Sequence, residues 1–287
     1  MAVTPPIWAG LRLDRPRVMG ILNVTEDSFS DGGAHASAEA AIAAGLAMHA
    51  DGADIVDVGG ESTRPGAAPV TPEAEAARIA PVIAGLSARG VIVSADTRNA
   101  ATMQAALDAG ARIINDVSGL RHDPDAAALV AGRGCPVVLM HMRGSPLTMG
   151  CMAHYAELIG DVLDELTATR DAALIAGIRA EAIALDPGFG FAKRGDQNVS
   201  LLRALKRFAA LGHTLLIGLS RKKFIGEVSG EPDPRQRLGG SLAAGLYAVT
   251  QGAHILRVHD VKETAQALRV WQGLIAGDDG DESQTRD

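Results

Sequence analysis

The sequence predicts an α/β protein with a single domain, a (β/α)₈ TIM barrel. Short runs of apolar and β-branched residues recur along the chain, and Ala-rich segments with helical spacing lie between them. Strands that alternate with helices indicate parallel pairing through right-handed crossovers. Eight such units favour a closed barrel, and a doubly wound open sheet remains the alternative because periodicity does not show closure.

The expected strands follow one another at short intervals. In chain order they are Val18–Leu22, Asp54–Val58, Val91–Ser94, Arg112–Ile114, Pro136–Met140, Ala182–Leu185, Thr214–Ile217 and His254–Arg257. One intervening helix is predicted to begin with Thr71 as N-cap and Pro72 in the first turn, and to end at Gly90. Another shows apolar residues at a spacing of four from Leu158 onward.

Composition limits the domain organisation and the partners. No repeat, linker or low-complexity block divides the 287 residues, so we expect a barrel domain over 1–276 and an acidic disordered tail over 277–287. The formal charge of −7 argues against a nucleic-acid partner. No apolar run approaches the roughly 18 residues of a membrane span, and the start lacks a signal-peptide pattern. We therefore expect no membrane partner and a cytoplasmic location.

Polar residues lie within or directly after nearly every expected strand. They are Asn23, Asp57, Asp96, Asn115, Asp116, His141, Asp186, Ser220, Arg221, Lys222, Arg257 and His259. A single Asp or Asn after a strand is usually a helix N-cap, but the whole set is not easily explained in that way. In a barrel these positions meet at one rim, which is where barrel enzymes carry out their chemistry.

Two kinds of chemistry are combined at this predicted rim. Asp96, Asp186 and the amide of Asn115 suit a flat ligand with several N–H donors, because a buried carboxylate needs such donors. The neighbouring bases suit an anion such as phosphate, although each could instead form a salt bridge to a rim carboxylate. They are Arg64, Arg221, Lys222, Arg257 and His259. Walker, dinucleotide-binding, HExxH, GxSxG and CxxC motifs are absent.

Eight segments resemble the dihydropteroate synthase family of folate biosynthesis. They are MGILNVTEDSFSDGG (19–33), DIVDVGGESTRPG (54–66), SADT (94–97), IINDVSG (113–119), LMHMRGSPLTM (139–149), LDPGFGFAK (185–193), GLSRKKFIG (218–226) and LRVHDV (256–261). The resemblance implies a TIM-barrel transferase that forms a homodimer and uses Mg²⁺. It would join 6-hydroxymethyl-7,8-dihydropterin diphosphate to 4-aminobenzoate, giving 7,8-dihydropteroate and diphosphate.

The resemblance also implies a role for each matching residue. Asp96, Asn115 and Asp186 would bind the N–H edge of the pterin, with Lys222 on the other side of the ring and Met140 and Phe191 packed near it. Arg257 and His259 would bind diphosphate, and Asn23 would adjoin Mg²⁺. Asp96, Lys222, Arg257 and His259 would be catalytic. Thr63 and Arg64 would lie between the two substrate sites, and Phe29, Thr63, Pro65 and Ser220 would line the aminobenzoate pocket, where sulfonamides bind in this family.

Further expectations concern the loops and the dimer. Loops 25–37 and 61–70 are rich in Gly, Ser and Pro, and we expect them to close over diphosphate and exclude water. Glu26 stands where the family usually has proline, which frees the backbone φ and adds a negative charge. The expected dimer surface comprises Ser241–Ala248 and Thr264–Ile275.

Two alternatives to the synthase are open. A methyltetrahydrofolate methyltransferase barrel would share the pterin-binding acids and amide. It needs no diphosphate site, so the segments 59–66, 220–226 and 257–261 argue against it. A noncatalytic pterin-binding paralogue is opposed by intact Asn23, Arg64, Lys222, Arg257 and His259, but only an assay separates it from an enzyme. The sequence does not distinguish a dissociative reaction from in-line displacement.

Overall fold

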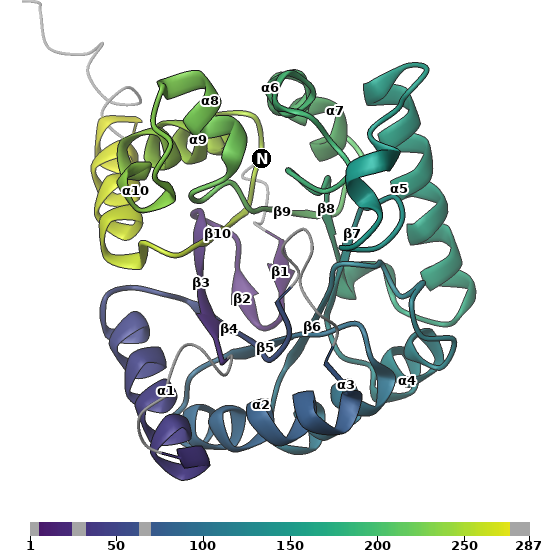
Figure 1. The fold of residues 1–287 in the computed structure, drawn as a ribbon, viewed down its shortest axis with the longest axis vertical. Helices are drawn as coiled ribbons and strands as arrows, with labels where there is room; N and C mark the ends of the chain where they lie inside the picture. Colours follow the sequence, from purple (N-terminus) through teal and green to yellow (C-terminus); the bar gives the residue numbers. More distant parts are fainter. Residues whose placement is uncertain (1–5, 25–32, 63–69, 276–287) are drawn as a thin grey trace, which may run out of the picture.

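A computed structural model of the protein describes residues 6–24, 33–62 and 70–275, with the backbone alone for 33–37. Its central feature is a closed barrel of parallel strands, in the order β10-β3-β4-β5-β6-β7-β8-β9 (Figure 1). The strands are β3 (Arg17–Asn23), β4 (Ile55–Gly59), β5 (Val93–Asp96), β6 (Ile113–Asp116), β7 (Val137–Met140), β8 (Ile183–Asp186), β9 (Thr214–Ile217) and β10 (Ile255–Val258). The predicted barrel is confirmed, and the open-sheet alternative is wrong.

Helices surround the barrel on its outside (Figure 1). They are α1 (Gly33–Ala50), α2 (Pro72–Ser87), α3 (Ala100–Asp108), α4 (Ala126–Arg133), α5 (Leu158–Ile175), α6 (Gly195–Arg203), α7 (Leu205–Ala209), α8 (Lys223–Ser229), α9 (Leu238–Thr250) and α10 (Val261–Ile275). Short 3₁₀ turns occupy Met149–Met152, Ala180–Ala182 and Pro234–Gln236. None of the described helices is both long enough and apolar enough to cross a membrane. The expected acidic tail lies outside the described residues.

The predicted start of α2 is confirmed, and its predicted end is wrong. The Thr71 hydroxyl accepts a hydrogen bond from the Ala74 N–H at 3.3 Å, as an N-cap should. The helix ends at Ser87 rather than at Gly90, because the Ala88 N–H makes the last helical bond and the chain then turns through Gly90 at φ +81°.

Most strands lie one or two residues later than predicted. The apolar runs predict strands that end before most of the polar residues. Asp96 and Asn115 instead face each other within the β5–β6 ladder, and Asp186 pairs with Met140 in β7–β8. Backbone hydrogen bonding does not require apolar side chains, so the ladders extend into the polar residues.

The interior of the barrel is apolar at the amino ends of its strands. Met19, Ile55, Ile113, Val138, Ala184, Leu216 and Ile255 form one buried cluster there. The opposite faces of the same strands pack against the helices, where they form the larger core. Side chains alternate between the two faces of a strand, so every barrel strand except β5 contributes to both clusters.

A hairpin that the sequence analysis did not predict covers this apolar floor. Strands β1 (Ile7–Trp8) and β2 (Leu11–Arg12) pair antiparallel through Ala9 and Gly10, which both have positive φ, as a tight two-residue turn requires. Trp8 is buried against the floor cluster together with Leu13. The Trp8 indole donates to the Ala182 carbonyl at 3.0 Å, at the foot of β8.

Candidate active site

The candidate site lies at the carboxyl ends of the strands. Every second residue of a strand points into the barrel, and this alternation determines which side chains face the site. Two residues after each floor residue, the next inward position carries a predicted site residue in four of the strands and the carboxylate of Asp57 in a fifth. These positions are Asp57, Asn115, Met140, Asp186 and Arg257. Asp96 ends β5 beside them. The predicted convergence of acids and bases at one end of the barrel is confirmed.

Arg257 joins three strands of the barrel through its guanidinium. Its Nε donates to Asp57 at 2.6 Å and an Nη donates to Asp96 at 2.5 Å. The same Asp57 oxygen accepts from the Asn115 amide at 3.0 Å. Asp57 is fully buried, so it needs these partners to remain charged. The network holds a diphosphate-site candidate and two pterin-site candidates in one arrangement.

Burial within this network shifts the pKa values of both Asp96 and Arg257. Burial raises the pKa of Asp96 to about 7, because desolvation and the nearby Asp57 charge outweigh the favourable effect of Arg257. Burial also works against the charge on Arg257, but Asp57 and Asp96 more than compensate and raise its pKa. Asp96 therefore changes its charge near neutral pH, while Arg257 stays cationic.

Asp186 and Lys222 form the second half of the site. Asp186 is buried and accepts a hydrogen bond from the Gly188 N–H at 2.8 Å. Desolvation raises its pKa, against the opposing effects of that hydrogen bond and of Lys222. Burial lowers the pKa of Lys222 to about 8 although Asp186 favours its charge. The Lys222 ammonium lies 4.4 Å from the centre of the Phe191 ring, a cation–π contact that places Phe191 beside the acids and bases.

Several polar atoms here have no hydrogen-bonding partner within the described residues. One of them, the Oδ1 of Asp57, is fully enclosed. Four others are the second oxygen of Asp96, the second oxygen of Asp186, the side-chain oxygen of Asn115 and the ammonium of Lys222. All four groups lie at the end of the barrel where a ligand would enter. Because unpaired buried polar groups are costly, they favour a polar ligand that supplies both donors and acceptors.

His259 and Ser220 lie beside this network and are linked to each other. The Ser220 Oγ lies 3.1 Å from the His259 Nδ1 and also accepts from the His259 backbone N–H at 3.2 Å. The residue predicted for the aminobenzoate pocket thus adjoins one predicted for diphosphate. Arg221, one of the anion-binding candidates, forms an ion pair with Asp260, which confirms its salt-bridge alternative.

The part of Asp57 was missed at the sequence level. It was noted as a polar residue within a strand but was given no function. The available signal was its place in Ile55–Gly59, where a lone carboxylate occupies an inward position between apolar neighbours. A charge at such a position needs a buried counterion, and Arg257 provides it from β10.

The predicted metal residue has modest ligating capacity. Asn23 ends β3 with an exposed side chain and offers one amide oxygen. Among the described residues, no group of three His, Cys, Asp or Glu side chains could hold a metal ion. Asn23 therefore fits a hard cation only if other oxygen ligands accompany it, as Mg²⁺ commonly has on phosphate substrates.

Four predicted site residues lie outside the described residues. They are Phe29, Thr63, Arg64 and Pro65. Glu26 and most of the two loops expected to close over the site also lie there, so the lid hypothesis stays a prediction. Of the pterin and diphosphate candidates, the structure describes Asn23, Asp96, Asn115, Met140, Asp186, Phe191, Lys222, Arg257 and His259.

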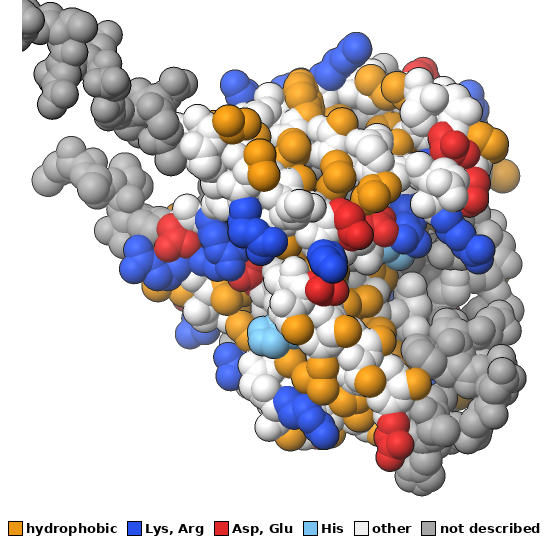
Figure 2. All heavy atoms as spheres, turned by 90° about the vertical axis from the view of Figure 1, so that its left-hand side faces the viewer, with side chains coloured by type: hydrophobic (Ala, Val, Ile, Leu, Met, Phe, Trp, Pro, Cys, Tyr) orange, Lys and Arg blue, Asp and Glu red, His pale blue; other side chains and the backbone are white. Residues whose placement is uncertain are grey.

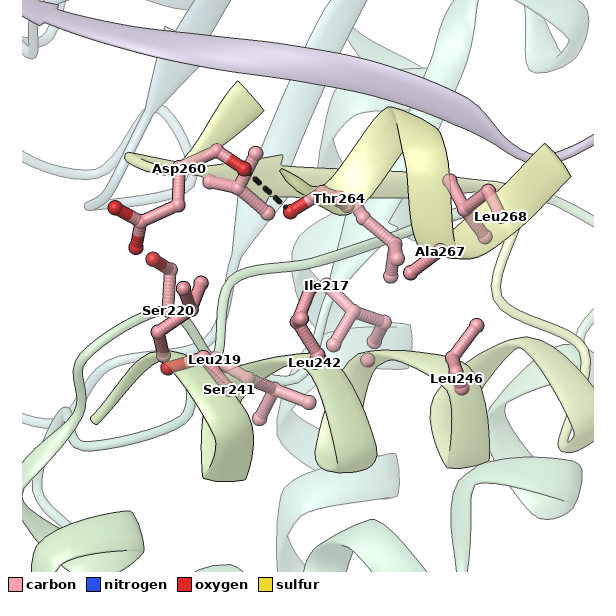
Figure 3. A pocket seen from close by; sticks show the side chains of 14 residues that line it. Ile217, Leu219, Ser220, Ser241, Leu242, Leu246, Asp260, Thr264, Ala267 and Leu268 are labelled. Carbon is pink, nitrogen blue, oxygen red and sulfur yellow. Dashed lines mark hydrogen bonds between the residues drawn. The ribbon is translucent and has the colours of Figure 1, made fainter. Parts of the chain in front are cut away.

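A separate apolar pocket lies outside the barrel, between α9 and α10 (Figure 3). Leu242, Leu246 and Leu268 line it from the two helices, while Ser220 and Asp260 lie at its end nearest the rim. The Thr264 hydroxyl donates to the Asp260 carbonyl at 2.7 Å at the start of α10. The pocket lacks the paired acids and bases of the barrel mouth, so we place the chemistry at the mouth.

Comparison with known proteins agrees with this geometry. Residues 19–259 match the family model described as "Pterin binding enzyme". The dihydropteroate synthase of Neisseria meningitidis serogroup C is 46% identical over 265 residues, covering 91% of this chain and 94% of that protein. The chain belongs to the dihydropteroate synthase family.

Solved dihydropteroate synthases share the whole fold. The Xanthomonas albilineans enzyme with 4-aminobenzoic acid superposes with a TM-score of 0.88 at 50% identity, covering 93% of this chain and 97% of that one. Its complex with 7,8-dihydropteroate gives a TM-score of 0.84 at 48% identity, covering 93% and 96%. The polar mouth of this barrel is therefore the mouth of a dihydropteroate synthase barrel.

Proposed function

We propose that the protein is a dihydropteroate synthase, a transferase that condenses 6-hydroxymethyl-7,8-dihydropterin diphosphate with 4-aminobenzoate and releases diphosphate. The observation that carries this proposal is the set of unpaired acceptors and donors at the barrel mouth. Asp96, Asn115 and Asp186 lie there beside Lys222 and Arg257. The relatives and solved structures compared above are synthases, which decides against the methyltransferase alternative.

The acids and the amide would bind the pterin. A dihydropterin presents an amino group and ring N–H groups in one plane, and the unpaired oxygens of Asp96, Asn115 and Asp186 can accept from them. Lys222 would donate to the ring from the Phe191 side, with Met140 as an apolar neighbour. Charge-assisted hydrogen bonds of this kind contribute about 1.5–3 kcal/mol each.

Arg257 and His259 would bind the diphosphate and stabilise its charge as it leaves. One Arg257 Nη makes no hydrogen bond within the described residues, so it can donate to a phosphate oxygen while Asp57 and Asp96 hold the rest of the guanidinium. Stabilising the departing charge lowers the barrier to breaking the carbon–oxygen bond. The exocyclic carbon becomes cationic, the electron-rich pterin delocalises that charge, and Asp96 stabilises it. The aminobenzoate nitrogen then attacks this carbon.

Asn23 would contact Mg²⁺, with diphosphate oxygens and water completing the coordination. When bound, the ion would neutralise negative charge on the leaving diphosphate. The lone amide at the end of β3 supports a metal that depends on substrate rather than a permanent protein site.

Ser220, Phe29, Thr63 and Pro65 would form the aminobenzoate pocket, with Arg64 between it and the pterin site. Ser220 is buried shortly after β9 and its hydroxyl lies 3.1 Å from the His259 Nδ1, which supports a pocket next to the departing diphosphate. Sulfonamides that mimic aminobenzoate would compete there.

The proposal is tested by incubating the purified protein with the pterin diphosphate, aminobenzoate and Mg²⁺. We expect a product with the mass of dihydropteroate and release of one diphosphate per turnover, both inhibited by a sulfonamide. Pterin binding without product under these conditions would instead identify the noncatalytic paralogue.

We also propose that the protein is a cytoplasmic homodimer that pairs through α9 and α10. Tyr247, Val270, Leu274 and Ile275 are exposed hydrophobic side chains on these two helices. Figure 2 views the side of the molecule that carries α10, where hydrophobic side chains lie between Lys and Arg. Light scattering should give twice the mass of the 29.6 kDa chain, and Leu274→Glu should reduce it to the monomer.

A further inference from the structure

Lys193 is a buried cation with no function in the reaction described above. Its Nζ donates to the carbonyls of Gly188 and Phe191, both at 3.0 Å, and lies 2.9 Å from the His141 Nδ1. A charged ammonium has three protons, and each can be directed to one of these acceptors. The three acceptors belong to the loops that follow β7 and β8, so one side chain connects two neighbouring loops of the rim.

The loop after β8 needs such support because its backbone repeatedly adopts positive φ angles, once at a residue other than glycine. Gly188 and Gly190 have φ values of +73° and +78°, and Ala192 has a φ of +50° although it carries a Cβ. A left-handed alanine costs about 1–2 kcal/mol and persists only where its surroundings hold it. Lys193 holds the loop through the carbonyls of Gly188 and Phe191, and Asn198 of α6 accepts from the Gly190 N–H at 2.7 Å.

This loop carries parts of the pterin site. Its first member, Gly188, donates to Asp186, and its Phe191 ring contacts the Lys222 ammonium. A Cβ at Gly190 would lie 3.3 Å from the Lys222 side chain, which shows how closely the loop and the lysine pack. The backbone that Lys193 fixes thus determines where Asp186, Phe191 and Lys222 lie relative to one another.

The charge of Lys193 is matched through a chain of partners that reaches the surface. The His141 Nδ1 accepts from Lys193, so its Nε2 carries the proton and donates to Glu165 of α5 at 3.0 Å. Glu165 is also paired with Arg143. Burial and Lys193 together lower the pKa of His141 to about 3, so the imidazole is neutral and can accept. Asp186 and Glu165 both favour the charged form of Lys193, while burial lowers its pKa to about 7.

We propose that Lys193 is a positioning residue for pterin recognition, which clamps the Gly188–Phe191 turn against His141 and so sets the geometry of Asp186, Phe191 and Lys222. This inference rests on the function proposed above and adds a residue that touches neither substrate. It makes pterin affinity depend on Lys193, while aminobenzoate affinity does not, because the hydrogen bonds of the Lys193 ammonium within the described residues go to the β7 and β8 loops.

The test compares Lys193→Met, which keeps the length of the side chain but removes all three donors, with Lys206→Met, which removes an exposed lysine of α7. Calorimetry measures the affinity for hydroxymethylpterin, and steady-state kinetics measure the KM for aminobenzoate at saturating pterin diphosphate. We expect Lys193→Met to bind pterin at least about tenfold more weakly, with the KM for aminobenzoate changed less than twofold. Lys206→Met should leave both values unchanged.

Lys193→Arg is the conservative variant for this comparison. It also tests the inference if Lys193→Met does not fold. It keeps a cation, but a planar guanidinium cannot direct three donors from one nitrogen, so we expect a smaller loss of about three- to tenfold. Unchanged pterin affinity in the folded variants, or equal weakening of both substrates, would overturn the inference. A wild-type protein that makes no dihydropteroate would instead refute the proposed function, since the binding measurement does not require turnover.

Discussion

The two ends of the barrel are built from the same strands and behave in opposite ways. At the amino ends Ile55, Ile113, Ala184 and Ile255 form an apolar floor under the hairpin. Two positions along, on the same faces, stand Asp57, Asn115, Asp186 and Arg257. A strand rises about 3.3 Å per residue, so stability and chemistry are separated by only about 7 Å. The comparison teaches that each of these four strands is divided into a packing half and a binding half.

The largest effect on stability should come from the floor. Trp8→Ala removes a buried indole and its hydrogen bond to Ala182, so we expect a loss of about 3–5 kcal/mol in the free energy of unfolding. Urea denaturation measures this loss, and kcat/KM at a temperature where the variant is folded should change less than about threefold. A large change in kcat/KM would contradict the division of each strand into two halves.

Replacing Arg257, a residue of the rim, should reduce both folding stability and substrate binding. Arg257→Ala leaves the fully buried Asp57 without its cation, which we expect to cost about 3–5 kcal/mol of folding stability. It should weaken the binding of pterin with and without diphosphate, because Asp96 also loses its partner.

His259→Ala is the matched test of diphosphate binding alone. Its hydrogen bonds to the Ser220 Oγ do not involve the buried acids, so we expect about a tenfold loss of affinity for the diphosphate substrate only. Calorimetry with the pterin that carries diphosphate and the pterin that lacks it distinguishes His259→Ala from Arg257→Ala.

For Arg257→Ala, an unchanged free energy of unfolding would show that the contact with Asp57 is dispensable.

Asp186→Ala should reduce pterin affinity about 100-fold with little effect on folding. The ligand loses charge-assisted hydrogen bonds, while the fold loses only the bond to the Gly188 N–H and is relieved of a buried carboxylate. Asp164→Ala on α5 removes an exposed acid and is the control. An unchanged dissociation constant for hydroxymethylpterin would show that Asp186 does not bind the ring.

The smallest effect is the dependence on pH. Pterin N–H groups bind the ionised form of Asp96, whose pKa is raised to about 7, so affinity should be highest above this value and fall as the pH drops through it. Lys222 loses its proton above about pH 8, so a second, shallower decline should follow there. The measurement is kcat/KM for the pterin substrate from pH 5.5 to about 9.5. Lys222→Arg should remove the alkaline decline, and a flat acid side would show that Asp96 is ionised throughout.

The sequence was sufficient for the parts that depend on periodicity. Eight alternating strand–helix units favoured a closed barrel over an open sheet, and polar residues after the apolar runs predicted that Asp96, Asn115, Asp186, Lys222 and Arg257 converge. It was insufficient where the cause is a single distant contact. The burial of Asp57 becomes meaningful only when β10 brings Arg257 to it, and Lys193 acquires its acceptors only when the β7 and β8 loops meet.

The N-terminal hairpin was missed for a different reason. Its strands have two residues each, which is too short for an apolar run, and its anchor Ala182 is 174 positions away. The early placement of the strand ends has a related cause, since hydropathy decreases before the backbone ladder ends. Hydropathy therefore reports the packing half of a strand and omits the binding half.

The pairing of β10 with β3 has a consequence for how the protein is made. Val258 lies opposite Gly20, so the seam of the cylinder joins residues from the two extremes of the chain. During synthesis, the first strand emerges from the ribosome long before its neighbour exists. Until then one edge is open to pairing with another nascent chain, and contacts this distant in sequence form slowly. The barrel therefore closes only after β10 has been synthesised.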